Sequence, residues 1–262
     1  MPHIINQSKF QKWQKPSFCY LCGVPLDNGL LLNDDHCPPE AMFKVADRIN
    51  YPIKLKVHEK CNHSWHINDE KMGIFYDILH GGNKITTPEL QNKLTFQDVE
   101  TNQGVFKGIT EFPLVPLVHR IIHCMHALLY HEYLPNQTKH YIHYPIPELD
   151  QLSGNQPIMH ELQTYQFADK LCIAQKTKTQ DLVIANNHQF KYVCTWSKAD
   201  NGTPMCFFAF DIYQLSRIAI KIQNFPKAII GFYSTVNTPN DASKCSDLLI
   251  KNTDSEILYP IL

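Results

Sequence analysis

The sequence lacks the features that mark membrane, secreted and strongly basic proteins. No apolar run approaches the about 18 residues that cross a membrane, and residues 1–7 have no apolar core of a signal peptide. The 24 lysines and arginines face 25 aspartates and glutamates, so no overall positive field attracts a polyanion. We therefore expect a cytoplasmic protein without a membrane partner, which binds any nucleic acid through a local patch, a metal ion or a partner protein.

The sequence also gives no sign of a disulfide framework. Its nine cysteines are an odd number, and the closely spaced pair is Cys19 and Cys22. In a reducing compartment this spacing is typical of metal ligation. Five other cysteines lie in apolar settings, which predicts small buried hydrophobic residues. They are Cys124, Cys172, Cys194, Cys206 and Cys245.

Two short pairs predict a structural zinc site. Cys19-x-x-Cys22 and His58-x-x-Cys61 carry the thiolate and imidazole ligands that zinc prefers, each pair on one tight turn. Gly23 follows the second cysteine and relieves its turn. A zinc deaminase does not fit, because its signature places the C-x-x-C last and puts a proline before it. The sequence therefore predicts one zinc ion held by these four residues.

The residues between and after these pairs resemble a known family. They read Cys19-Tyr-Leu-Cys22-Gly, Asp35-His36-Cys-Pro-Pro39, Cys61-Asn62 and Asp69-Glu70. In this order they resemble the HNH endonucleases, the ββα-metal nucleases, and more narrowly a bacterial stand-alone subgroup. The resemblance covers about residues 18–75, under a quarter of the chain.

The resemblance implies both an activity and a site. The activity is hydrolysis of DNA phosphodiester bonds, with His36 as general base and one divalent ion, Mg²⁺ or Mn²⁺, held by Asp35 and Asn62. His66 lies four residues after Asn62, on the same helical face, and matches the extra histidine ligand of colicin-type members. Asn50 is the nearest candidate for the middle asparagine of the motif. The resemblance also implies a setting in bacterial antiviral defence.

Other interpretations of these residues stay open. Asp35 and His36 also suit a turn in which the aspartate caps the backbone, and Asn62 suits a helix N-cap. Two other functions fit the sequence as well. One is a catalytically inactive zinc-ribbon protein that binds nucleic acid or protein. The other is a nuclease that cuts only within a complex, with its C-terminal domain as the docking surface for a protein partner.

Periodicity predicts an α+β fold that begins with a zinc-stapled ββα-metal module over residues 1–81. We expect its strands near 30–32 and 53–57 and its helix over about 62–80. Trp13 is the expected anchor of an arm that precedes the module.

Residues 82–262 are expected to form a second α+β domain. It should contain loops and one weak strand up to residue 112, a core helix over about 114–131, and a mainly antiparallel sheet from about 181. Asp200-Asn201-Gly202 predicts a hairpin turn, with further strands near 218–222 and 228–233. The histidines and the arginine on the core helix are expected on its polar face, and two later histidines in loops. They are His119, Arg120, His123 and His126, then His140 and His143.

Overall fold

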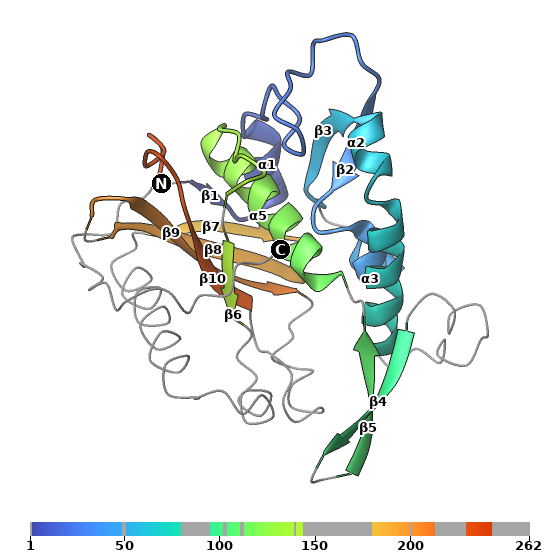
Figure 1. Cartoon of the computed structure of the whole chain (residues 1–262). Helices are drawn as coiled ribbons and strands as arrows, with labels where there is room; N and C mark the ends of the chain where they lie inside the picture. Colours follow the sequence, from blue (N-terminus) through green and yellow to red (C-terminus); the bar gives the residue numbers. More distant parts are fainter. Residues whose placement is uncertain are drawn as a thin grey trace.

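The computed structural model of the chain describes residues 2–48, 51–79, 95–101, 104–110, 113–138, 140–143, 180–199, 201–212 and 229–242. These residues form a mixed α+β fold with few helices. Figure 1 shows a large sheet on one side, a ββα unit on the other, and the helix α5 between them.

The main sheet has six strands in the order β1-β7-β8-β9-β10-β6. Its strands are β1 (His3–Ile4), β6 (His140–His143), β7 (Asp181–Ala185), β8 (Phe190–Lys198), β9 (Pro204–Ile212) and β10 (Ile229–Ser234). β1 runs parallel to β7, and every other neighbouring pair is antiparallel. The predicted turn between β8 and β9 contains Gly202 at a φ of 81°, a value that glycine adopts without strain. The mainly antiparallel sheet predicted from about residue 181 is thus confirmed.

Two predictions for this half of the chain are wrong. His140 and His143 lie in β6 rather than in loops, because the intervening Tyr and Ile favour a strand and pair with β10. In the region predicted to hold one weak strand, β4 (Thr95–Thr101) and β5 (Gly104–Thr110) form an antiparallel hairpin. The expected strand at 218–222, with Cys172 and Cys245, lies outside the described residues.

Helix α5 (Leu114–Tyr130) packs on the main sheet and confirms the predicted core helix. Seven apolar residues of its stripe are at most 3% exposed: Leu117, Val118, Ile121, Ile122, Met125, Leu128 and Leu129. Burying each large side chain contributes about 1.5–3 kcal/mol, so this stripe holds the helix in place. The hydroxyl of Tyr130 fixes the end of α5, because it donates to Asp181 Oδ2 (2.7 Å) and accepts from Trp196 Nε1 (2.9 Å).

The predicted polar face of α5 is wrong. Arg120, His123 and His126 are only 2–3% exposed, because the ββα unit and β6 cover the side of the helix that sequence alone leaves open to solvent. Buried charged and polar side chains need partners, so these residues mark where α5 makes specific contacts.

The ββα unit begins with an antiparallel hairpin of β2 (Leu32–His36) and β3 (Lys54–His58). Exposed lysines alternate in β3 with buried Leu55 and Val57, as its period of two predicts. The first strand starts later than predicted: Leu31 is 75% exposed and pairing begins at Leu32. Two short 3₁₀ turns, η1 (Glu40–Met42) and η2 (Val45–Asp47), lie between the strands.

Two helices, α2 (Glu59–His63) and α3 (His66–Leu79), replace the single helix predicted over 62–80. The break falls at Ser64 and Trp65. The Ser64 hydroxyl donates to the carbonyl of Cys61 (2.7 Å), and such side-chain bonds to the backbone compete with the helical pattern.

The N-terminal arm joins the ββα unit to the rest of the fold. Helix α1 (Gln7–Lys12) is capped by the side chain of Asn6, which accepts from the backbone N–H of Lys9 (2.9 Å). Trp13 is an anchor as predicted, since its Nε1 donates to the carbonyl of Leu128 on α5 (2.7 Å). No helix of the described residues is both long and apolar enough to span a bilayer.

Candidate functional site

The two predicted zinc pairs meet in space. Cys19, Cys22, His58 and Cys61 each offer a ligand atom, and these atoms lie within 4.8 Å of one another. Cys22 Sγ lies 3.4 Å from His58 Nδ1, which is therefore the ring nitrogen that faces the thiols. Three thiols and one imidazole are a preferred donor set of structural zinc, so these side chains fit and could hold a zinc ion.

The backbone around each pair explains this convergence. In the first pair, the N–H groups of Cys22 and Gly23 both donate to the carbonyl of Cys19, at 3.2 and 2.7 Å, which closes a tight turn. Gly23 has a φ of 76°, and a Cβ there would lie 2.8 Å from the ring of Tyr133. His58 ends β3 and Cys61 lies on α2, so the hairpin carries the second pair to the first.

Burial, with a smaller contribution from neighbouring thiols, raises the pKa of Cys19 and Cys61. Burial raises the pKa of Cys61 to about 12, with further contributions from Cys19 and Cys22. Burial also raises the pKa of Cys19, again with the nearby thiol of Cys22 contributing. A bound dication would reverse this effect, because it stabilises the thiolates.

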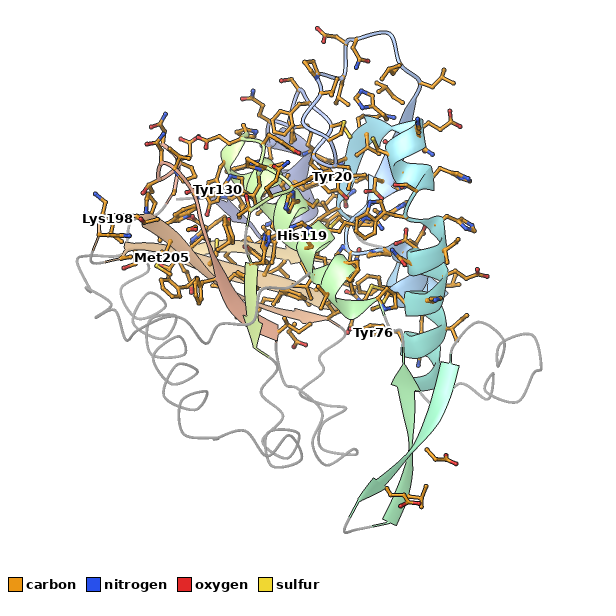
Figure 2. All side chains as sticks on the ribbon, viewed as in Figure 1. Tyr20, Tyr76, His119, Tyr130, Lys198 and Met205 are labelled. Atoms are coloured by element: carbon orange, nitrogen blue, oxygen red, sulfur yellow. The ribbon has the colours of Figure 1, made fainter. Side chains whose placement is uncertain are left out.

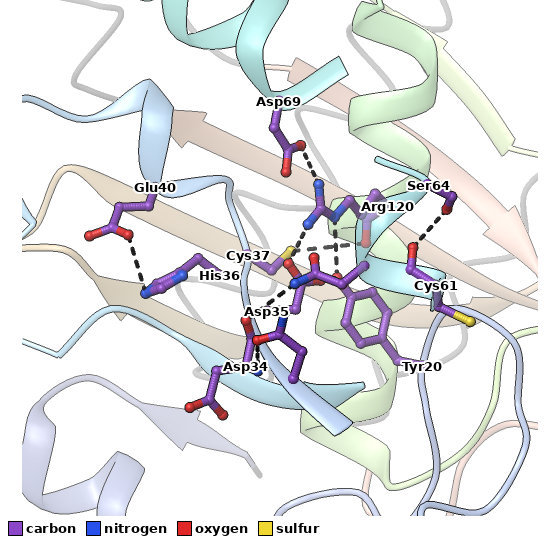
Figure 3. Close-up of polar contacts among 12 residues, drawn as sticks. Tyr20, Asp34, Asp35, His36, Cys37, Glu40, Cys61, Ser64, Asp69 and Arg120 are labelled. Carbon is purple, nitrogen blue, oxygen red and sulfur yellow. Dashed lines mark hydrogen bonds and ion pairs between the residues drawn. The ribbon is translucent and has the colours of Figure 1, made fainter. Parts of the chain in front are cut away.

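A second cluster lies under α3, where Arg120 of α5 reaches into the ββα unit (Figure 3). Its guanidinium forms ion pairs with the carboxylates of Asp35 on β2 and Asp69 on α3. The hydroxyl of Tyr20 donates to the other oxygen of Asp35. The centroid of the Trp65 ring lies 5.2 Å from the guanidinium carbon of Arg120, within cation–π range. The side chain of Arg120 has no exposed surface, so its charge depends on these partners.

The same cluster perturbs its acidic and phenolic members. Burial raises the pKa of Asp69 to about 6, and Arg120 opposes that shift. Burial and then the charge of Asp35 raise the pKa of Tyr20. Both shifts reflect how little solvent reaches the space between β2, α3 and α5.

Asp35, the predicted ligand of a catalytic ion, already has other partners. One carboxylate oxygen accepts from Arg120 and the other from Tyr20, and the residue is 2% exposed. The guanidinium therefore stands beside Asp35 where a metal ion would have to bind, and the carboxylate does not fit a catalytic ion in this arrangement.

His36, the predicted general base, lies on the opposite side of β2. Successive strand residues point to opposite faces, and Figure 3 shows His36 turned toward Glu40, away from Arg120. Its Nε2 is a buried atom that has no hydrogen-bond partner among the described residues and lies 3.7 Å from Glu40 Oε2. Burial lowers the pKa of His36, and Glu40 opposes the shift, so the imidazole is neutral at pH 7.

The other two predicted ligands lie on α2 and at the start of α3. Asn62 is on α2 rather than at a helix N-cap, and its Nδ2 donates to the carbonyl of Asp34 (3.4 Å). His66 is exposed, and its ring stacks on that of His63 with centroids 6.1 Å apart. Asn50 lies outside the described residues.

Sequence analysis missed Arg120 as a member of this site. The signal was present, because an arginine inside a strongly apolar helix needs acidic partners if the helix is covered. Which carboxylates supply them was not visible, since Asp35 and Asp69 lie 85 and 51 residues away in the chain.

A pocket of about 400 Å³ opens between α5 and the start of the ββα helices. His119, Arg120 and His123 line it from α5, and Cys61 and Trp65 line it from the other side. The pocket therefore lies next to both the zinc-type cluster and the histidines of α5.

Comparisons with models of protein families, with curated proteins and with solved structures find no match for this chain.

Proposed function

We propose that this protein is a DNA endonuclease built on a zinc-stapled ββα module, with His36 as the general base. The observation that carries the proposal is the position of His36. It ends the first strand of a hairpin that leads directly into a Cys₃His cluster and two helices, and its Nε2 has no hydrogen-bond partner within the described ranges. This order of elements supports the resemblance to HNH nucleases.

The chemistry assigned to His36 follows from its surroundings. A neutral imidazole accepts the proton of a water molecule that attacks the phosphorus of the scissile bond. Glu40 Oε2, 3.7 Å from Nε2, then stabilises the imidazolium that forms. A divalent ion supplies phosphate activation in such hydrolysis. The ion pair with Arg120 leaves the carboxylate of Asp35 unavailable to such an ion in the described arrangement.

Cleavage of a supercoiled plasmid in Mg²⁺ or Mn²⁺ tests the proposal. We expect wild-type protein to nick or linearise the plasmid and His36→Ala to lose at least about 100-fold of the rate, the usual contribution of a general base. His63→Ala is the control, because His63 is a histidine of the same unit that is exposed and lies outside the proposed chemistry, whereas His36 is half-buried. Equal cleavage by wild type and His36→Ala would remove His36 from the mechanism.

The Asp35–Arg120 pair favours a second candidate function, a zinc-ribbon protein that binds nucleic acid or protein without cutting. In this case the buried pair has a structural role and the catalytic ion has no place. Fluorescence anisotropy with a labelled DNA duplex separates the two candidates. Binding by wild type without cleavage in either metal supports the second, whereas cleavage that depends on His36 supports the first.

A further inference from the structure

Three histidines from two distant elements gather beside the pocket. His119 and His123 lie one turn apart on α5, and His140 comes from β6 at the edge of the main sheet. Each offers a ring nitrogen, and these atoms lie within 4.8 Å of one another. Figure 2 shows His119 on α5 between the main sheet and the ββα unit.

Two ring nitrogens of this cluster lie close together. The Nε2 atoms of His119 and His123 are 3.0 Å apart, a distance at which one ring donates a hydrogen bond to the other. Two nitrogens bound to one zinc ion at 2.0–2.1 Å, at a tetrahedral angle, lie about 3.3 Å apart. A small movement of either ring would therefore separate the two nitrogens enough for both to bind one ion.

His140 supplies the independent observation. The residue is 4% exposed, and its Nε2 is buried without a hydrogen-bond partner in the part of the chain that the structure describes. A hydrogen bond joins its ring to the backbone of Thr138, and since Nε2 has no partner, that bond uses Nδ1. Metal-binding histidines commonly hold their second nitrogen in this way, which leaves the first free for the ion.

A neighbouring histidine shows what a purely structural role looks like on the same helix. His126 is equally buried, but its Nδ1 is hydrogen-bonded to the hydroxyl of Tyr233 at 2.8 Å. His126 therefore has a partner in the protein, whereas Nε2 of His140 has none among the described residues.

We propose that His119, His123 and His140 form a second metal site, for Zn²⁺ or a similar divalent transition metal, with its fourth coordination position open to the pocket. Imidazole nitrogens suit these metals. Three histidines with one open position are the pattern of catalytic rather than structural zinc. His119 and His123 line the pocket, so a water molecule or small anion there can reach the ion. Burial lowers the pKa of all three rings, to about 2 for His123 and about 3 for His140.

Metal stoichiometry of the full-length protein tests this site. After removal of metal and titration with Zn²⁺, we expect two equivalents per chain, one for each cluster. His119→Gln, at a partly exposed position, should bind one equivalent. His126→Gln is the matched control, because it keeps a polar partner for Tyr233 and should bind two. One equivalent in wild type, or two in His119→Gln, would overturn the proposal.

Nitrogen NMR of the histidine rings gives a readout that needs no variant. In zinc-saturated wild-type protein, metal-bound nitrogen signals should come from His58 and from all three rings of the cluster. A metal-bound signal from His58 alone would overturn the proposal.

With Co²⁺ in place of zinc, azide should change the visible absorption of the histidine site if its fourth position is open. An unchanged spectrum would show that the position is closed.

Discussion

The carboxylate of Asp35 on β2 forms a buried ion pair with the guanidinium of Arg120 on α5. The contact ties the hairpin of the ββα unit to the helix that covers the main sheet. Asp69 of α3 shares the same guanidinium, so three elements meet at one cation. The same contact supports the competing functional proposal, because it removes Asp35 from solvent.

Replacing Arg120 should destabilise the protein strongly. Arg120→Gln leaves Asp35 and Asp69 without their cation, and breaking a buried pair in this way costs about 3–5 kcal/mol. Urea unfolding measures the loss. Lys56→Ala is the control, because Lys56 Nζ pairs with Asp34 Oδ1 at 2.9 Å but both side chains are about half exposed. That pair should contribute only about 0–1 kcal/mol. Similar losses in the two variants would contradict the structural role of Arg120.

Cys22→Ser should lose one zinc equivalent and destabilise the ββα unit. The four-ligand cluster joins the turn that follows Phe18 to the end of β3. Serine is a poor substitute for a thiolate on zinc, so this connection should be weakened. Elemental analysis and circular dichroism measure the two effects. Cys206→Ala, a buried cysteine of β9, should retain the zinc content of wild type. A folded wild-type protein without zinc would refute the cluster as a metal site.

The pH profile of DNA cleavage should extend to the acid side of an ordinary histidine. The base must be neutral, and burial lowers the pKa of His36 below its usual value of about 6.5. The rate should therefore hold below pH 6.5 and fall only on further acidification. Glu40 acts against this shift, so Glu40→Gln should move the acidic limb to still lower pH. A limb that moves upward in this variant would contradict the assignment of His36.

Acid should destabilise the protein partly through His126. Burial lowers the pKa of His126 to about 3, whereas the unfolded chain binds the proton near pH 6.5. This stability is present above pH 6.5 and is lost as the pH falls toward 3. Between pH 7.5 and 5.5, wild type should lose about 1.4 kcal/mol more than His126→Gln in urea unfolding. Equal losses would mean that His126 is protonated in the folded state.

Local sequence patterns predicted the helices and strands of this fold better than they predicted the contacts between them. The stripe of α5, the alternation in β3 and the turn at Gly202 each depend on neighbours in the chain, and each is present. The zinc-type cluster was also predictable, since its four residues form two short pairs with a recognisable spacing.

The rest depends on contacts that the spacing of residues does not reveal. Arg120 lies four residues before Cys124 on an apolar helix, and nothing near it indicates that Asp35 is its partner. Of the histidine cluster, the sequence reveals only His119 and His123, which stand at helical spacing. His140 joins them because β6 pairs with β10, an arrangement set by the assembled sheet.

The parallel pairing of β1 with β7 has a consequence for how the chain assembles. The strands place His3 Nε2 2.9 Å from the carbonyl of Gln180, 177 residues later. During synthesis, residues 19–61 emerge together and can gather their metal ligands early, because a short loop costs little entropy to close. β1 precedes these residues in the chain but has no partner in the sheet until β7 follows. We therefore expect β1 to join the sheet late, after the four ligands of the zinc-type cluster have come together.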